Sequence, residues 1–218
     1  PHIGNVGTNK EDFESDKIWT KGVIFNSEIT SPSNYRSFQH LDSWLKKNKI
    51  VGITGLDTRS LTNFIRDKGA PKGTIAHSKK SKFHINKLTN STIKWSGLKN
   101  LDLAEKVTTQ KNYIWKGLKT WKKEYGYRKN NQNLFHVVAI DYGIKKNILR
   151  YFSDFKCKVT VVSCKTPAEK ILSLKPNGVF LSNGPGDPAA TGQYAIKIIQ
   201  NLIQKKCHYL VFVLVIRY

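Results

Sequence analysis

The chain has 218 residues, enough for one large or two small domains that each bury a hydrophobic core. Its formal net charge is +22, and the basic residues are mostly Lys, spread along the whole chain rather than gathered in one segment. We interpret this as a solvated basic surface and keep nucleic-acid binding as the weaker alternative, because phosphate clamps favour clustered Arg. No apolar run in the sequence reaches the length of a membrane span.

The cysteines give no sign of a disulfide framework or a zinc site. Cys157, Cys164 and Cys207 form no CxxC pair and are odd in number. Free thiols fit a reducing compartment, so we expect a cytoplasmic protein. The chain starts at Pro1 and contains no Met, so we expect a fragment, and organellar targeting stays open.

The first half of the chain has the pattern of a small α/β domain. Strands are predicted over residues 21–25 and 49–53, and helices over residues 40–47 and 58–68, the second capped by Asp57. A further helix is predicted over residues 95–108, because leucines and a valine recur there at suitable spacing. Residues 116–133 are polar and basic, which predicts an interdomain linker.

After residue 134, strands alternate with helices. The predicted strands cover residues 135–140, 158–162 and 178–181, and the predicted helices cover residues 144–152, 166–174 and 189–204. A fourth strand is expected to follow. This alternation predicts a parallel, doubly wound sheet, in which ligands bind at the carboxyl ends of the strands.

The third of these strands ends in Ser182-Asn-Gly-Pro-Gly-Asp-Pro188. Gly184 and Gly186 permit backbone conformations that are closed to other residues, and Pro185 fixes the dihedral angle between them. The result is a stiff loop with exposed amide groups at the end of a strand. Without its context, Gly-Pro-Gly is more typical of an ordinary tight turn between a strand and a helix.

The string from Ser182 to Pro188 resembles the loop of the class I glutamine amidotransferase domain in the small subunits of carbamoyl-phosphate synthase. Two earlier stretches resemble the small-subunit-specific domain of the same family: Pro1-His-Ile-Gly-Asn-Val-Gly-Thr-Asn9, and residues 50–69 with their Asp57-Thr-Arg59 element. On physical grounds alone, Asp57 and Arg59 are a helix cap and a surface charge.

The resemblance implies three segments. Residues 1–115 are expected to form the small-subunit N-terminal α/β domain with its start missing, and residues 116–133 the linker. Residues 134–218 are expected to form the N-terminal part of a truncated, doubly wound class I amidotransferase domain.

The resemblance also implies a function, that of the glutaminase subunit. In this family a Cys thiolate, activated by a His that a Glu orients, attacks the glutamine carboxamide. The ammonia passes to the large subunit, which makes carbamoyl phosphate for pyrimidine and arginine synthesis. Gly184 and Gly186 match glutamine-contacting positions, and the amide of Gly184 matches an oxyanion-hole donor.

The implied partners are the large subunit and L-glutamine, with neither nucleic acid nor membrane. No cofactor is expected in this chain, since ATP, bicarbonate and a divalent metal belong to the large subunit.

The end of the chain departs from the family. Where family members carry the nucleophile elbow Gly-Ile-Cys-Leu-Gly-His-Gln, this chain reads Cys207-His-Tyr-Leu-Val-Phe-Val-Leu-Val-Ile-Arg-Tyr218. Residues 210–217 can be encoded TTG GTA TTT GTC TTG GTC ATC AGA. With each codon begun one base earlier, the same bases translate as the family's elbow. We therefore expect a frameshift near Lys205-Lys206, with the tail from about residue 206 out of frame.

Cys207 lacks the glycines of an elbow and is interpreted as an incidental thiol. No residue matches the family's nucleophile, His or Glu, so we expect no catalytic residue, no metal site and no glutamine hydrolysis in this exact polypeptide. Two alternatives stay open: a non-catalytic protein that binds a large subunit, and a basic nucleic-acid-binding module. Copurification without glutaminase activity would indicate the first, and steeply salt-dependent binding the second.

Overall fold

The computed structural model describes residues 2–129, 131, 133–205 and 209–211. The chain divides into two compact units, Pro1–Gly97 and Leu98–Val215. This division falls earlier than residue 115, where sequence analysis ended the first domain. The limits of the family domains therefore remain a prediction, and the two compact units are described separately below.

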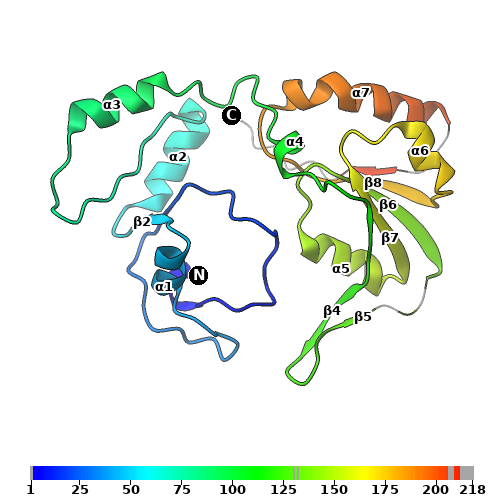
Figure 1. Ribbon diagram of the computed structural model, residues 1–218, viewed down its shortest axis with the longest axis horizontal. Helices are drawn as coiled ribbons and strands as arrows, with labels where there is room; N and C mark the ends of the chain where they lie inside the picture. The colour runs from blue at the N-terminus through cyan, green and yellow to red at the C-terminus, as the bar shows by residue number, and fades with distance from the viewer. Residues whose placement is uncertain (1, 130, 132, 206–208, 212–218) are drawn as a thin grey trace. The chain divides into compact units, whose positions relative to one another are not determined.

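The first unit contains short elements joined by long loops (Figure 1). Its elements are a 3-10 helix at Ile3–Asn5, β1 (Gly22–Ile24), α1 (Leu41–Lys47), β2 (Val51–Ile53), α2 (Thr58–Lys68) and α3 (Ile85–Lys94). The two strands pair in parallel. The Asp57 carboxylate accepts hydrogen bonds from the amides of Arg59 and Ser60, so it caps α2 as predicted. α1, α2 and both strands confirm the sequence pattern, whereas α3 was not predicted.

The predicted helix over residues 95–108 is wrong. Only α4 (Ala104–Val107) is helical there, and Trp95 ends α3. The physical reason is local, because Gly97 and Asn100 have φ angles of 85° and 61°. Left-handed residues cannot continue a right-handed helix. Residues 98–109 instead belong to the second unit and contact the ends of its strands, and we call them the strap.

The second unit is built on a five-stranded sheet with the order β3-β7-β6-β8-β9. Its strands are β3 (Tyr113–Trp115), β6 (Phe135–Asp141), β7 (Cys157–Ser163), β8 (Gly178–Leu181) and β9 (Tyr209–Val211). β6 to β9 are parallel, and β3 adds an antiparallel edge to β7. The connecting helices are α5 (Lys146–Asp154), α6 (Ala168–Ser173) and α7 (Pro188–Gln204). The doubly wound parallel α/β fold is thus confirmed.

Hydrophobic side chains cover both faces of this sheet. On one face, Leu149 of α5 packs in a buried cluster with Phe180. On the other face, Ile171 of α6 and Leu202 of α7 pack in a cluster with Ile140. Figure 1 shows α5 apart from α6 and α7, on opposite sides of the strands. Because both faces are buried, β6 to β8 are largely apolar, which is why their pattern was recognisable in the sequence.

Residues 116–133 differ from the predicted linker. They contain the antiparallel hairpin of β4 (Gly117–Lys122) and β5 (Gly126–Lys129). The hairpin packs on α5, where the Lys119 amide donates to the Asp154 carboxylate at 3.0 Å. The Arg150 guanidinium of α5 lies 4.1 Å from the ring centroid of Tyr127. Polar composition concealed this hairpin, which makes cation–π and polar contacts with the helix.

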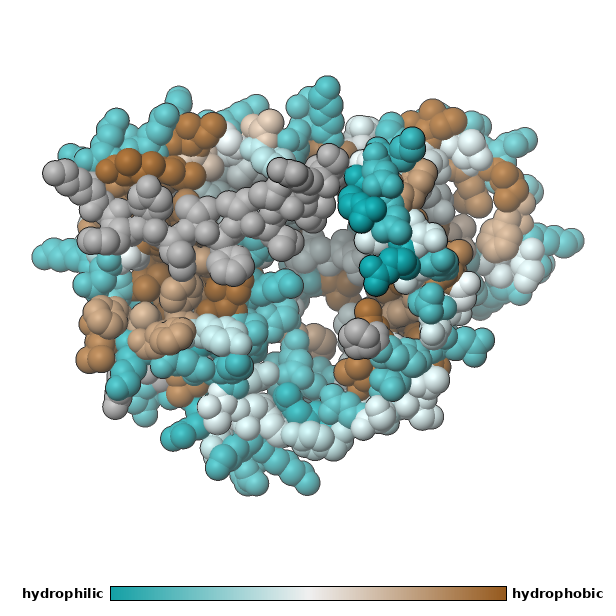
Figure 2. Space-filling view, turned by 180° about the vertical axis from the view of Figure 1, so that it is seen from behind, coloured by the Kyte–Doolittle hydropathy of each residue, from teal (hydrophilic) through white to brown (hydrophobic). Residues whose placement is uncertain are grey.

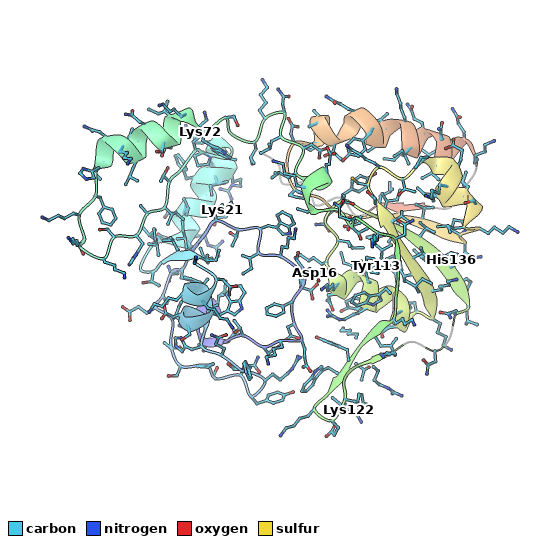
Figure 3. All side chains as sticks on the ribbon, in the orientation of Figure 1. Asp16, Lys21, Lys72, Tyr113, Lys122 and His136 are labelled. Carbon is cyan, nitrogen blue, oxygen red and sulfur yellow. The ribbon has the colours of Figure 1, made fainter. Side chains whose placement is uncertain are left out.

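The basic side chains are distributed over both units. Lys21 and Lys72 of the first unit and Lys122 of the second are exposed and far apart in sequence (Figure 3). Figure 2 shows hydrophilic side chains over much of one face, with hydrophobic ones between them. Among the described residues, none of the helices combines the length and hydropathy that crossing a bilayer requires.

Candidate functional site

The strand order of the second unit reverses between β6 and β8. The chain passes from β6 through α5 to β7, then returns through α6 to β8 on the opposite side of β6. In open, doubly wound sheets, ligands bind beyond the carboxyl ends of the strands at such a reversal. Two loops meet there, residues 142–145 after β6 and residues 182–187 after β8.

The two predicted glycines lie in the loop after β8, and each is in close contact with another segment. A Cβ atom built on Gly184 would lie 2.6 Å from the carbonyl oxygen of Tyr142. Gly186 has a φ angle of 92°, and a Cβ atom on it would lie 2.5 Å from the carbonyl oxygen of Leu101. Only glycine fits either position. The loop therefore touches the loop after β6 through Gly184 and the strap through Gly186.

Ser182 joins the loops after β6 and β8. Its hydroxyl accepts a hydrogen bond from the Tyr142 amide and donates one to the Asn183 carbonyl, both at 2.9 Å. Its own amide donates to the Ile140 carbonyl at 3.3 Å. Because Ser182 is buried, these bonds are shielded from water. The start of the glycine loop is therefore fixed to the end of β6.

Asp141 at the end of β6 is an anchor that sequence analysis did not identify. Its carboxylate is buried and accepts three backbone hydrogen bonds: from Gly143 and Ile144 at 2.9 Å each, and from Thr109 at 2.7 Å. A carboxylate with three amide donors is a fully satisfied buried charge. The available signal was an Asp directly after an apolar strand and two residues before a glycine. Asp141 therefore ties the strap to the loop after β6.

Asp187 closes the glycine loop and makes three hydrogen bonds through its carboxylate and its amide. One carboxylate oxygen accepts from the Ala189 amide at 2.9 Å and caps α7, and the other accepts from the Asn100 amide at 2.7 Å. The Asp187 amide donates to the Leu101 carbonyl at 3.1 Å. The Asn100 and Ala189 amides lower the pKa of the Asp187 carboxyl below its ordinary value of 3.8. The carboxylate is thus ionised at neutral pH, and its contacts weaken only when the pH falls through that lowered pKa.

A polar cluster lies at the carboxyl end of β7. The Cys164 amide donates to the Thr108 hydroxyl at 3.0 Å. The Tyr194 hydroxyl is 3.5 Å both from the Asp102 carboxylate and from the Cys164 sulfur. Burial, and then the neighbouring Cys164, raises the pKa of Tyr194, so the phenol is neutral. The Thr191 hydroxyl also donates to Asp102, at 3.2 Å. The strap thereby reaches the ends of β6, β7 and β8.

Tyr142 offers a test of burial at this site. Its hydroxyl is buried and has no hydrogen-bond partner among the described residues, and burial raises its pKa to about 12. Tyr142→Phe should therefore raise the free energy of unfolding by about 1 kcal/mol, because it removes an unpaired polar atom. Tyr194→Phe is the matched control and should lower it by about 1 kcal/mol, because that hydroxyl is bonded. Urea denaturation measures both; a loss for Tyr142→Phe would show that its hydroxyl has a partner.

The described residues hold no group of three or more His, Cys, Asp or Glu side chains able to bind a metal ion. Cys164 is buried, and Cys207 lies outside the described residues. His136 lies at the amino end of β6, opposite the glycine loop. Its burial, and then the charge of Lys158, lowers the pKa of His136. The site therefore consists of a loop whose backbone is held in place and tolerates only glycine at positions 184 and 186, and Gly184 is exposed to solvent. Exposed, preorganised amides are suited to a carbonyl oxygen or an oxyanion.

Comparisons with known proteins agree with this geometry. The family model of the carbamoyl-phosphate synthase small chain, CPSase domain, matches residues 1–75, and that of glutamine amidotransferase class-I matches residues 138–210. The second match begins within β6, ends within β9 and contains the glycine loop. The predicted out-of-frame tail lies mostly outside the described residues, and the structure does not bear on it.

Curated relatives align with most of this chain. The carbamoyl phosphate synthase small chain of Agrobacterium fabrum is 51% identical over 211 residues, and that of Bartonella henselae is 52% identical over 209 residues. These alignments cover 94% and 93% of this chain, but 53% and 52% of the relatives. The chain thus spans about half the length of the curated relatives it matches. With both family models and these identities, it belongs to the carbamoyl phosphate synthase small-chain family.

Proposed function

We propose that this chain carries the glutamine-binding loop of a carbamoyl-phosphate synthase small subunit, which hydrolyses glutamine and supplies ammonia to a large subunit. One observation supports this most directly. A class I amidotransferase match covers a doubly wound sheet whose Gly-Pro-Gly loop lies at the reversal of strand order. The family match and the position of the loop at a ligand-binding edge together support the proposed glutamine site.

In the proposed reaction, a thiolate attacks the carboxamide carbon of glutamine, and negative charge develops on the carbonyl oxygen. The amide of Gly184 donates a hydrogen bond to that oxygen, and the backbone at Gly186 contacts the bound glutamine. One such preorganised donor is worth about 2.7–4 kcal/mol in the transition state. The contacts of Ser182 and Tyr142 hold the donor in place before the substrate arrives.

The thiolate, its His and the orienting Glu have no matched positions in the sequence as written. The proposed partner is the large subunit, which uses ATP, bicarbonate and a divalent metal to convert ammonia into carbamoyl phosphate. We assign none of these cofactors to the residues of this chain.

The test begins with the coding DNA. It is sequenced across the codons for residues 204–218 and further downstream. If a reading frame restores Gly-Ile-Cys-Leu-Gly-His-Gln, the protein encoded in that frame is expressed together with the large subunit. Glutamate release from L-glutamine is expected from that protein and not from the 218-residue chain. If the present frame stands, and the chain binds the large subunit without releasing glutamate, the proposal fails in favour of a non-catalytic binding protein.

Gly184→Ala tests the assigned oxyanion donor in the active protein. A Cβ atom would lie 2.6 Å from the Tyr142 carbonyl oxygen and displace the amide, so kcat should fall about 10²- to 10³-fold. Gly73→Ala is the matched control, since a Cβ atom on Gly73 meets nothing within 4 Å. Steady-state glutaminase kinetics measure both variants. Equal kcat values would remove Gly184 from the oxyanion hole.

A further inference from the structure

The strap contacts all three loops at the carboxyl edge of the sheet. Its Thr109 amide reaches Asp141 at the end of β6, its Thr108 hydroxyl reaches Cys164 after β7, and its Asn100 amide reaches Asp187 after β8. A Lys165–Glu105 ion pair adds a second link to the loop after β7. These contacts join segments that are distant in sequence, so the strap fixes the loops relative to one another.

The contact with the glycine loop is the closest of these. Gly186 approaches the strap so tightly that a Cβ atom on it would lie 2.5 Å from the Leu101 oxygen and 2.8 Å from the Leu103 nitrogen. On its carboxyl side, the Asp187 amide and carboxylate bond to Leu101 and Asn100. On its amino side, Pro185 lies against Gly143, where a Cβ atom would be 3.0 Å from the proline Cδ. The loop is thus held on both sides of Gly186.

We propose that Asp187 is a positioning residue for the glutamine loop, because it clamps Gly184–Gly186 to the strap through Asn100 and Leu101. The inference rests on the proposed function only in naming glutamine as the ligand. The clamp itself is a property of the fold and is tested without activity. Asp187 does not touch the ligand in this proposal; it acts by holding the backbone that does.

The two carboxylate oxygens of Asp187 separate the clamp from the helix cap. One oxygen caps α7 at the Ala189 amide, and the other binds the strap at the Asn100 amide. Serine has a single side-chain oxygen and is a good N-cap residue. Asp187→Ser should therefore keep the cap and lose the side-chain half of the clamp, the bond to Asn100, whereas Asp187→Ala loses both the cap and that bond. The backbone bond from residue 187 to Leu101 remains in either variant. If Asp187 served only as the cap of α7, the order parameters of Gly184 and Gly186 would be the same in Asp187→Ser and in the wild type.

The experiment uses the full chain labelled with ¹⁵N. In Asp187→Ser, we expect the Asn100 amide to exchange with solvent about ten- to a hundredfold faster, since it loses a bond to a charged acceptor. We also expect the order parameters of Gly184 and Gly186 to fall from about 0.85 toward about 0.6 or below, while those of α7 stay unchanged. Asp57→Ala is the matched control, because Asp57 also caps a helix but belongs to the first unit, where its carboxylate accepts from Arg59 and Ser60.

Two outcomes would overturn the proposal. The first is faster exchange at Asn100 with unchanged order parameters at Gly184 and Gly186, which would show that the loop is rigid without the clamp. The second is an equal loss of loop order in Asp187→Ser and Asp57→Ala, which would indicate general destabilisation. Neither outcome depends on glutaminase activity, so a failure of the clamp is distinguishable from a failure of the proposed function.

Discussion

Gly186→Ala should lower the stability of the second unit by about 2–5 kcal/mol, since backbone strain and steric overlap add at this position. The φ angle of 92° is unfavourable for any L-residue with a side chain. A Cβ atom would also lie 2.5 Å from the Leu101 oxygen, and that backbone is held by the Asp187 amide and cannot withdraw easily. Hydrogen exchange of the β6 amides under native conditions measures the loss, because those amides report on their own unit.

Two other glycines separate strain from overlap. Gly69 has a φ angle of 80° but a Cβ atom on it meets nothing within 4 Å, so Gly69→Ala should show the strain alone, about 1–3 kcal/mol. Gly73 has open space and no positive φ, so Gly73→Ala should be nearly neutral. If Gly186→Ala destabilises the second unit by no more than Gly69→Ala destabilises the first, the close contact between strap and loop is contradicted.

Asp141→Ala should lower the stability of the second unit by about 3–5 kcal/mol, among the larger effects expected of a single substitution. Asp141 is 6% exposed and its carboxylate accepts from three backbone amides, so its removal leaves three donors with no acceptor in a buried place. The amide of Thr109 belongs to the strap, so the strap should also detach from the end of β6. Urea denaturation measures the total loss, and exchange at the Thr109 amide reports the detachment.

Asp154→Ala is the matched control for Asp141→Ala. Asp154 also accepts a backbone hydrogen bond, from the Lys119 amide at 3.0 Å, but at an exposed position on α5. Water can replace that acceptor, so the expected loss is about 1 kcal/mol or less. Similar losses in the two variants would show that Asp141 is no special anchor of the strap.

The parts that sequence alone predicted correctly are those with strong local signals. β6, β7 and β8 are largely apolar runs, and the helices between them have an amphipathic period, so the doubly wound sheet followed from pattern alone. The cap at Asp57 was predictable because it binds amides two and three residues ahead. The Gly-Pro-Gly loop was recognisable because few turns need two glycines around a proline.

The parts that sequence missed depend on contacts between distant residues. Leucines at helical spacing in residues 95–108 indicated a helix, but Gly97 and Asn100 are left-handed and the segment follows the sheet edge instead. Residues 116–133 looked like a linker because their partners, Asp154 and Arg150, lie on a helix further along the chain. In both segments, tertiary contacts determine a structure that differs from the one the local sequence pattern predicts.

The sequence by itself determined the fold class, the strand that carries the glycine loop, and the family to which the loop belongs. Only the tertiary structure showed what holds that loop, because the clamp joins Asn100 and Asp187, which are 87 residues apart. Secondary structure follows from the spacing of neighbouring side chains, which is written in the sequence. Close packing between the strap and Gly186 follows from where the sheet and its crossovers place two backbones, and no local pattern encodes that position.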